Sequence, residues 1–271
     1  MIRKQGWSLF TLWLIAATTH AQEDGGFAIR GRVVDAAAKP VAGAMVRLLA
    51  PGFGGFDVDE NTATGADGRF NIAAPRSWIR MDATQRQELA LLAVQGNRVA
   101  VVQFNRSSAP PRSEVELTLS NVGASKIEIR APDLRPVAGA KVKIAALISD
   151  MIHGELTEKE VQQYAGIARK TPIGYVIGTG TVALPQDLQI DIGATDAKGL
   201  ATVSHVAAAR IAAITVQADE FGEQTVGYYS VQGANAPDWI HRVVLKKTGR
   251  VVGQLSSPSA GAVAHREVTL T

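Results

Sequence analysis

The side chains that most often carry metal-dependent chemistry are widely separated in this sequence. After residue 21 the histidines are His153, His205, His241 and His265, and none belongs to a His-x-x-Glu or His-Glu-x-x-His motif. A zinc peptidase needs two histidines and an acidic ligand at close spacing. We therefore interpret each histidine as a strand or loop residue and predict no metal site and no catalytic residue.

One acidic stretch has the alternate spacing of oxygen ligands for calcium. Asp57, Asp59 and Asn61 are two positions apart, as in the first half of an EF-hand loop. Such a loop also needs glycine at its sixth position and glutamate at its twelfth, where this sequence has Thr62 and Gly68. The stretch is therefore interpreted as a polar loop ahead of a hairpin turn.

Nucleophile and nucleotide motifs also fail. The chain has no cysteine and no Gly-x-Ser-x-Gly, and residues 178–180 (Gly-Thr-Gly) lack the third glycine of a dinucleotide loop. The glycine-rich residues 51–56 do not end in the Gly-Lys-Ser/Thr of a phosphate site, so we predict a flexible loop there. Within it, Phe53 and Phe56 are candidate exposed contacts, and no cofactor is predicted.

Sugar binding is the one ligand hypothesis with candidate residues. Aromatic faces stack on sugar rings, and Trp78 and Trp239 both follow proline-containing loops that would permit exposure. The alternative is that these large side chains close a core of small residues. Both interpretations stay open.

The first 21 residues have the features of a secretory signal peptide. Arg3 and Lys4 precede a short apolar run, which ends in small residues at Ala21. Cleavage would change the formal charge from +3 to +1, and with no basic stripe we expect no nucleic-acid partner. The protein is predicted to be exported (periplasmic, cell-surface or secreted) with no later membrane span; the alternative is an uncleaved anchor.

The elements that would position any site come from an internal repeat. KPVAGAMVRL at residues 39–48 returns as RPVAGAKVKI at residues 135–144, 96 positions later. In each copy a proline turn leads into apolar residues at period two, which is the pattern of a strand with one buried face. Each copy also has a downstream glycine turn and further alternating runs. About seven short strands per copy predict all-β, tandem Ig-like or transthyretin-like sandwiches of about 100 residues.

The second copy is about 35 residues longer than the first, because the distance from the repeated motif to the glycine turn increases from copy to copy. Thr157 and Glu160 have capping-box spacing, and Val161 and Tyr164 start an apolar helical face. We expect one amphipathic helix lying against the second sandwich. The predicted organisation is residues 1–21, signal peptide; 22–121, first sandwich; 122–248, second sandwich with a helical insertion near 145–188; and 249–271, the start of a third, incomplete repeat.

The two copies resemble the carboxypeptidase regulatory-like domain family of transthyretin-like and starch-binding-like sandwiches. Ala38 departs from the family pattern, which has glycine before Lys39, and the second copy has Ile127 in place of the opening glycine. The resemblance implies an accessory module and says little about chemistry. In the first copy it rests on Gly31, Val33, Asp35, Pro40, Val41, Gly43, Ala44, Val46, Leu48, Thr64, Gly68 and Phe70, and in the second on Pro136, Val137, Gly139, Ala140, Thr195, Asp196 and Gly199.

These observations predict a non-enzymatic exported repeat protein that acts as a spacer, adhesion or protein-interaction module at the cell envelope. The short connection at residues 121–125 is expected to restrict motion between the modules. One alternative is a carbohydrate-binding module. Another is an accessory domain of a larger peptidase or outer-membrane receptor. The predicted partner is an envelope protein or a glycan.

Overall fold

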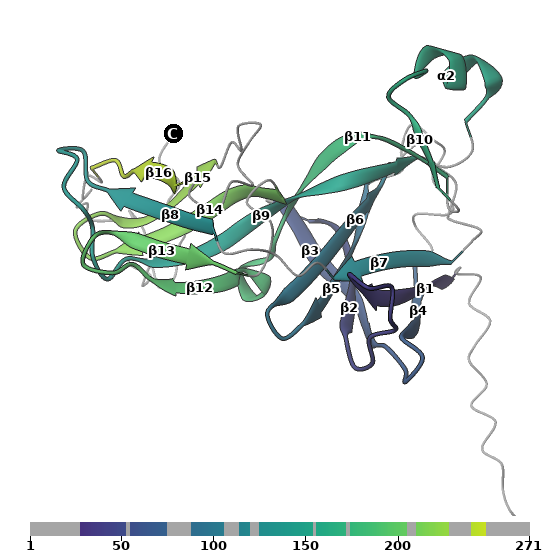
Figure 1. The fold of residues 1–271 in the computed structure, drawn as a ribbon, viewed down its shortest axis with the longest axis horizontal. Coiled ribbons are helices and arrows are strands. Elements are labelled where there is room, and N and C mark those ends of the chain that lie inside the picture. Colours follow the sequence, from purple (N-terminus) through teal and green to yellow (C-terminus); the bar gives the residue numbers. More distant parts are fainter. Residues whose placement is uncertain are drawn as a thin grey trace, which may run out of the picture.

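The computed structural model describes residues 28–52, 55–74, 88–105, 114–119, 125–153, 156–171, 174–204, 210–227 and 240–247. Over these residues the fold is all-β, as predicted, and the strands form two β-sandwich modules that lie end to end (Figure 1). The predicted signal peptide and third repeat lie outside the described residues, as does most of the connection at 121–125. The residue boundaries of the modules stay a prediction.

The first module packs a small sheet against a larger one. Its strands are β1 (Ala28–Asp35), β2 (Met45–Gly52), β3 (Gly55–Ala63), β4 (Arg69–Ala73), β5 (Leu89–Gln95), β6 (Arg98–Phe104) and β7 (Val115–Leu119). The small sheet has the order β4-β1-β7, with β4 antiparallel and β7 parallel to β1, and the large sheet has the order β3-β2-β5-β6. Burial alternates along β1, β4 and β7, so the predicted period-two pattern is confirmed there.

The second module repeats this arrangement strand for strand. Its strands are β8 (Ser125–Arg130), β9 (Lys141–His153), β12 (Ile190–Ala194), β13 (Leu200–Val203), β14 (Ile211–Ala218), β15 (Gly222–Gly227) and β16 (Ile240–Val244). The small sheet is β13-β8-β16, again with one antiparallel and one parallel neighbour. In the other sheet β9 lies between β12 and β14, as β2 lies between β3 and β5.

The repeated Pro-Val-Ala-Gly-Ala segment forms the same hydrogen-bonded unit in both modules. The buried Thr64 hydroxyl accepts a hydrogen bond from the Ala44 amide at 2.8 Å and donates one to the Val41 carbonyl at 2.7 Å. Thr195 makes the two equivalent bonds in the second module. The threonine therefore satisfies backbone groups that the turn leaves unpaired inside the sandwich.

The turn before this segment explains the glycine in the family pattern. Ala38 has φ 59° and its counterpart Leu134 has φ 66°, and this left-handed region favours glycine. The Asp35 carboxylate closes the turn by accepting hydrogen bonds from the backbone amides of Ala37 and Lys39. These backbone hydrogen bonds, that of Lys39 above all, lower the pKa of Asp35.

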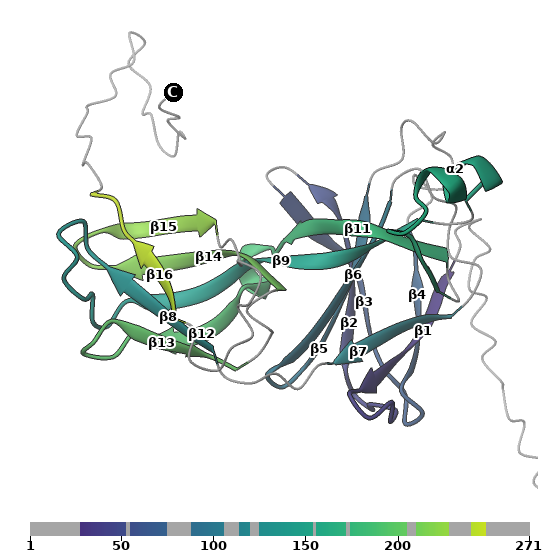
Figure 2. The ribbon, with the colours of Figure 1, turned by 45° about the horizontal axis from the view of Figure 1, so that its top comes forward.

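The two modules are joined by a strand that belongs to both. The first half of β9 pairs with β12 and β14 of the second module. Its second half continues into the first module, where Val102 and Phe104 of β6 pair in parallel with Asp150 and Ile152. One sheet therefore runs through both modules and joins them (Figure 2).

The insertion in the second copy is mostly strand. It contains β10 (Arg169–Thr171) and β11 (Gly174–Ala183), followed by the short helix η1 (Gln186–Leu188), and β11 pairs with β9 along its length. We call residues 148–183, the second half of β9 through β11, the arm. The arm extends the large sheet of the first module.

The predicted helix is present, but it is short. Helix α2 (Glu158–Gln163) lies at the tip of the arm and has the predicted capping box of Thr157 and Glu160. None of its residues is buried. The expectation of an amphipathic helix packed against the second sandwich was therefore wrong, because α2 has only six residues and lies exposed at the tip of the arm, beside the first module.

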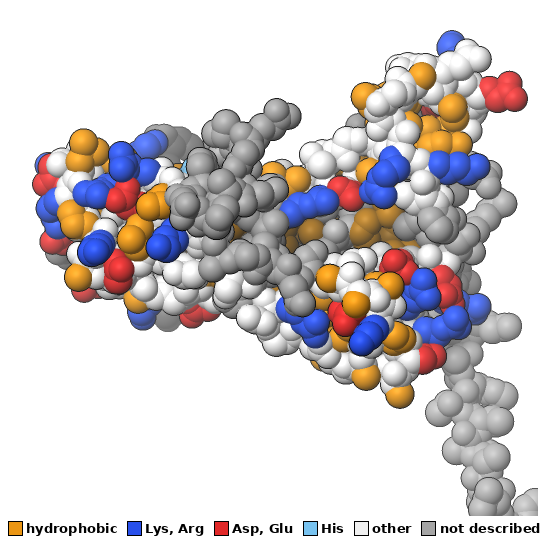
Figure 3. Space-filling model, viewed as in Figure 1, with side chains coloured by type: hydrophobic (Ala, Val, Ile, Leu, Met, Phe, Trp, Pro, Cys, Tyr) orange, Lys and Arg blue, Asp and Glu red, His pale blue; other side chains and the backbone are white. Residues whose placement is uncertain are grey.

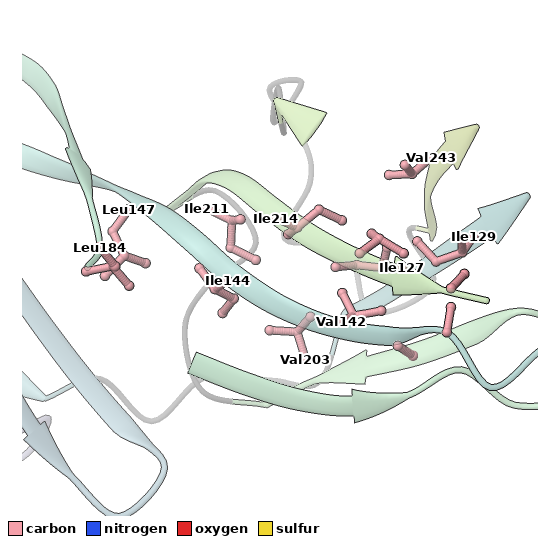
Figure 4. Close-up of a cluster of buried hydrophobic side chains, with 14 of the residues drawn as sticks. Ile127, Ile129, Val142, Ile144, Leu147, Leu184, Val203, Ile211, Ile214 and Val243 are labelled. Carbon is pink, nitrogen blue, oxygen red and sulfur yellow. The ribbon is translucent and has the colours of Figure 1, made fainter. Parts of the chain in front are cut away.

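Each module has its own cluster of buried apolar side chains. The cluster of the first module lies between its two sheets and includes Val33 and Phe104. The cluster of the second module includes Ile127 of β8 from one sheet, and Ile144 of β9 and Ile214 of β14, which are paired in the other sheet (Figure 4). The separate interiors expected for the two repeats are thus observed within the described residues.

The second cluster also reaches the first module. Alternate side chains of β5 belong to different clusters, since Leu91 contributes to the first and Leu92 to the second. Leu49 and Val99 join Leu92 on this outer face, in the same cluster as Leu147. An apolar interface therefore supports the shared strand.

Candidate binding cleft

A cleft of about 400 Å³ lies between β7 of the first module and the arm. Figure 3 shows it as a hollow with apolar side chains inside and charged side chains along both rims. The cleft exists because the two sheets of the first module differ in width. The small sheet ends at β7, whereas the large sheet continues through β9, β11 and β10.

The floor of the cleft is the inner face of the large sheet beyond β7. Ala100, Ile148 and Val176 line it and are only partly buried. Val102 and Ile152 lie on the same face and are buried in the first core. The floor is thus a continuation of the sandwich interior that no described strand of the small sheet covers.

One wall is the edge of β7. Val115 and Leu117 point into the core, while Glu116 and Thr118 are exposed. Among the described strands β7 pairs with β1 only. The backbone groups on its other edge face the cleft.

Both rims carry ion pairs. On the β7 side Glu116 lies 2.6 Å from Arg32, and Glu114, next to the strand, lies 3.2 Å from Arg69. These carboxylates are about half exposed, so each pair is screened and contributes little to stability.

On the arm side Asp150 lies between two arginines. Its carboxylate is 2.9 Å from Arg210 and 3.3 Å from Arg169. Arg210 immediately precedes β14 and Arg169 begins β10, so the Asp150–Arg210 pair connects the arm to the second module. The rims therefore combine a fixed structural cluster with the more accessible carboxylates of β7.

The described lining of the cleft combines apolar side chains with hydroxyl, carboxylate and guanidinium groups. None of these described groups is a nucleophile paired with a base. Within the described residues no three histidine, cysteine or acidic side chains are close enough to hold a metal ion. No described helix is long and apolar enough to cross a membrane.

Three of the four candidate contact residues from the sequence cannot be placed relative to the cleft. Trp78, Trp239 and Phe53 are outside the described residues, so sugar binding stays a prediction. The backbone of Phe56 pairs with Pro51 at the end of the β2–β3 hairpin.

The acidic stretch at residues 57–61 belongs to β3, so its interpretation as a polar loop was wrong. An edge strand tolerates polar residues because one of its sides meets water. Of the histidines, His153 lies in β9 and His241 in β16, and burial lowers the pKa of both. His205 and His265 lie outside the described residues.

Sequence reasoning missed the cleft. Glu116, Asp150 and Arg210 come from three segments, and none belongs to a recognisable motif. The available signal was the alternation of SEVELTL at residues 113–119, which places Glu114 and Glu116 on one face of a strand.

No family model and no curated protein matches the chain. Among solved structures, the chain is similar to the shaft pilin SpaA from Lactobacillus rhamnosus GG, at 10% identity over 84% of this chain and 100% of that one, with a TM-score of 0.25. It is also similar to the RrgB pilus protein from Streptococcus pneumoniae (12% identity, 86% and 48% covered, TM-score 0.21) and the Bacillus anthracis TIE protein (10%, 82% and 33%, TM-score 0.22). At these TM-scores the likeness supports no conclusion about function, and the resemblance to carboxypeptidase regulatory-like domains stays a prediction.

Proposed function

We propose that this protein is a non-enzymatic, exported β-sandwich repeat protein that holds a protein-contact surface at a fixed position at the cell envelope. The observation that carries the proposal is the course of β9, which is a central strand in both modules. A flexible tandem protein needs no such strand, since a short linker is enough to connect two domains.

Two features support a rigid arrangement. The parallel pairing of β6 with β9 places Ile152, from the second repeat, inside the first core. The apolar contact through Leu49, Leu92 and Val99 continues the second core onto the first module. A hinge motion between the modules would have to expose this apolar area, at about 25 cal/mol per Å².

The experiment is a distance measurement by electron–electron double resonance. Because the chain has no cysteine, Glu60→Cys on β3 and Glu223→Cys on β15 allow one spin label in each module. Both residues are exposed. We expect a single narrow distance distribution, and a broad distribution in the otherwise native protein would overturn the proposal.

A matched pair of variants tests whether the packing of Ile152 in the first core holds the two modules at a fixed distance. Ile152→Asp places a charge in the first core and is expected to broaden the distribution. Ile167→Asp, on the arm where the side chain is 66% exposed, is expected to leave it unchanged.

A further inference from the structure

We propose that the cleft binds an extended segment of another protein, which adds to the free edge of β7 as a further strand of the small sheet. This inference rests on the proposed function, because it takes the cleft to be the protein-contact surface proposed above. The segment would place apolar side chains over the floor and basic side chains opposite Glu114 and Glu116.

The backbone of β7 defines the conformation of the partner. Along Val115–Leu119 the hydrogen-bonding groups on one side face β1, and no described strand pairs with those on the other side, which borders the cleft. An unpaired strand edge is a template for an extended chain, which would lie about 4.8 Å away. The length of β7 limits the added strand to about five or six residues.

The floor of the cleft determines which side chains of the partner segment should be apolar. Facing sheets pack about 10 Å apart with interdigitating side chains, so alternate residues of an added strand would reach Ala100, Ile148 and Val176. These three residues are partly exposed and apolar. Aliphatic residues at every second position would extend the first core over them.

The charges on the β7 side of the cleft determine which side chains of the partner segment should be basic. Arg32 and Arg69 approach Glu116 and Glu114 from the side of β1 and β4. The opposite side of each carboxylate faces the position of the added strand. Opposite charges on directly paired residues stabilise a sheet by about 0.2–1 kcal/mol, so lysine or arginine is favoured there.

The second module supplies a matched control. The positions equivalent to Arg32 and Glu116 are Glu128 and Arg242, which form an ion pair at 2.6 Å with the charges reversed. The sandwich thus accommodates either orientation of the pair. The double variant Arg32→Glu/Glu116→Arg should fold while reversing one charge on the β7 rim.

The test uses the protein from residue 22 to residue 271 and fluorescein-labelled peptides KVTVKVTV and EVTVEVTV in an anisotropy titration. We expect saturable binding that favours the lysine peptide. In the double variant the lysine peptide should bind about fivefold more weakly and the glutamate peptide more tightly. Ile148→Lys should weaken both peptides, and circular dichroism reports whether each variant is folded.

A lysine peptide that is N-methylated at every backbone amide separates strand addition from charge attraction, because it has no N–H group left to donate to the edge of β7. The proposal is overturned if this peptide binds as well as the unmodified one, if the double variant leaves the preference unchanged, or if no binding occurs up to 1 mM. Self-association of the protein that the lysine peptide displaces would assign the cleft to a second copy and overturn the choice of partner. A narrow distance distribution together with no peptide binding would reject this inference and leave the rigid arrangement standing.

Discussion

Gly31 on β1 lies directly opposite Phe70 on β4, and the phenyl ring occupies the space that a side chain at position 31 would need. A Cβ atom there would lie 2.4 Å from Cζ of Phe70 and 2.3 Å from the carbonyl oxygen of Val115. In the second module the paired positions hold Ile127 and Ala201, so the large side chain is on the other strand. The two repeats therefore fill the equivalent space with a large side chain from opposite strands of the pair.

This relationship predicts strong coupling between positions 31 and 70. Gly31→Ile alone should destabilise the protein by about 3 kcal/mol through overpacking and strand displacement, and Phe70→Ala alone by about 3–5 kcal/mol through a cavity. The double variant imitates the second module and should cost at least about 2 kcal/mol less than the sum. Urea denaturation of the four proteins measures the coupling, and additive effects would contradict it.

The buried threonines give a second prediction. Thr64→Val keeps the size of the side chain but leaves the Ala44 amide and the Val41 carbonyl without their partner. Each unsatisfied buried group costs about 1–3 kcal/mol, so we expect a loss of about 2–6 kcal/mol for the two groups, and a similar loss for Thr195→Val. Thr202→Val on β13 is the matched control, because this threonine is exposed in a strand. Equal midpoints of Thr64→Val and Thr202→Val in urea would show that the hydroxyl is dispensable.

The left-handed turn residues give a prediction of opposite sign. A non-glycine residue in this region costs about 1–2 kcal/mol, and glycine removes that cost while adding chain entropy to the unfolded state. Ala38→Gly and Leu134→Gly should each stabilise the protein by about 0.5–1 kcal/mol. Leu134 is 58% exposed, so its removal loses little burial. The control is Ala37→Gly, in the same turn but outside the left-handed region, which should destabilise the protein. Thermal denaturation midpoints measure all three variants, and a lower midpoint for each of them would contradict the prediction that positions 38 and 134 are strained.

The parts of the fold that the sequence predicts are those set by local pattern. Period-two apolar residues identified β1, β4 and β7, and the capping box of Thr157 and Glu160 identified the start of α2. Each of these signals acts over a few residues, and the residues that satisfy it are neighbours in the chain.

The second half of β9 could not be predicted in this way. Residues 149–153 are strand because β6, about fifty residues earlier, pairs with one side of this segment and β11 with the other, and neither partner is visible in the segment itself. The cleft depends on the same pairing, since it determines how far the large sheet extends beyond β7. A site made by unequal sheet widths leaves no motif in the sequence.

The ion cluster around Glu128 gives a dependence on pH. Glu128 is buried on β8 and accepts hydrogen bonds from Arg130 and Arg242, which lower its pKa below the ordinary value of 4.5. The folded state therefore binds this proton more weakly than the unfolded state. The resulting stabilisation is complete above the unfolded pKa and is lost as the pH falls through the folded pKa.

Glu128→Gln should therefore be less stable than the native protein at pH 7, by about 2 kcal/mol, which is the typical value for hydrogen bonds to a charged group. The difference should shrink as the pH is lowered below 4.5, because the unfolded state then takes up a proton that the folded carboxylate still excludes. It should disappear once the pH is below the folded pKa and the native carboxylate is protonated as well. Glu60→Gln, on the exposed edge strand β3, should change stability little at either pH. Urea denaturation midpoints at pH 7 and pH 3 test this prediction. If the difference in midpoint between Glu128→Gln and the native protein is the same at both pH values, packing and not the charge on Glu128 accounts for the effect.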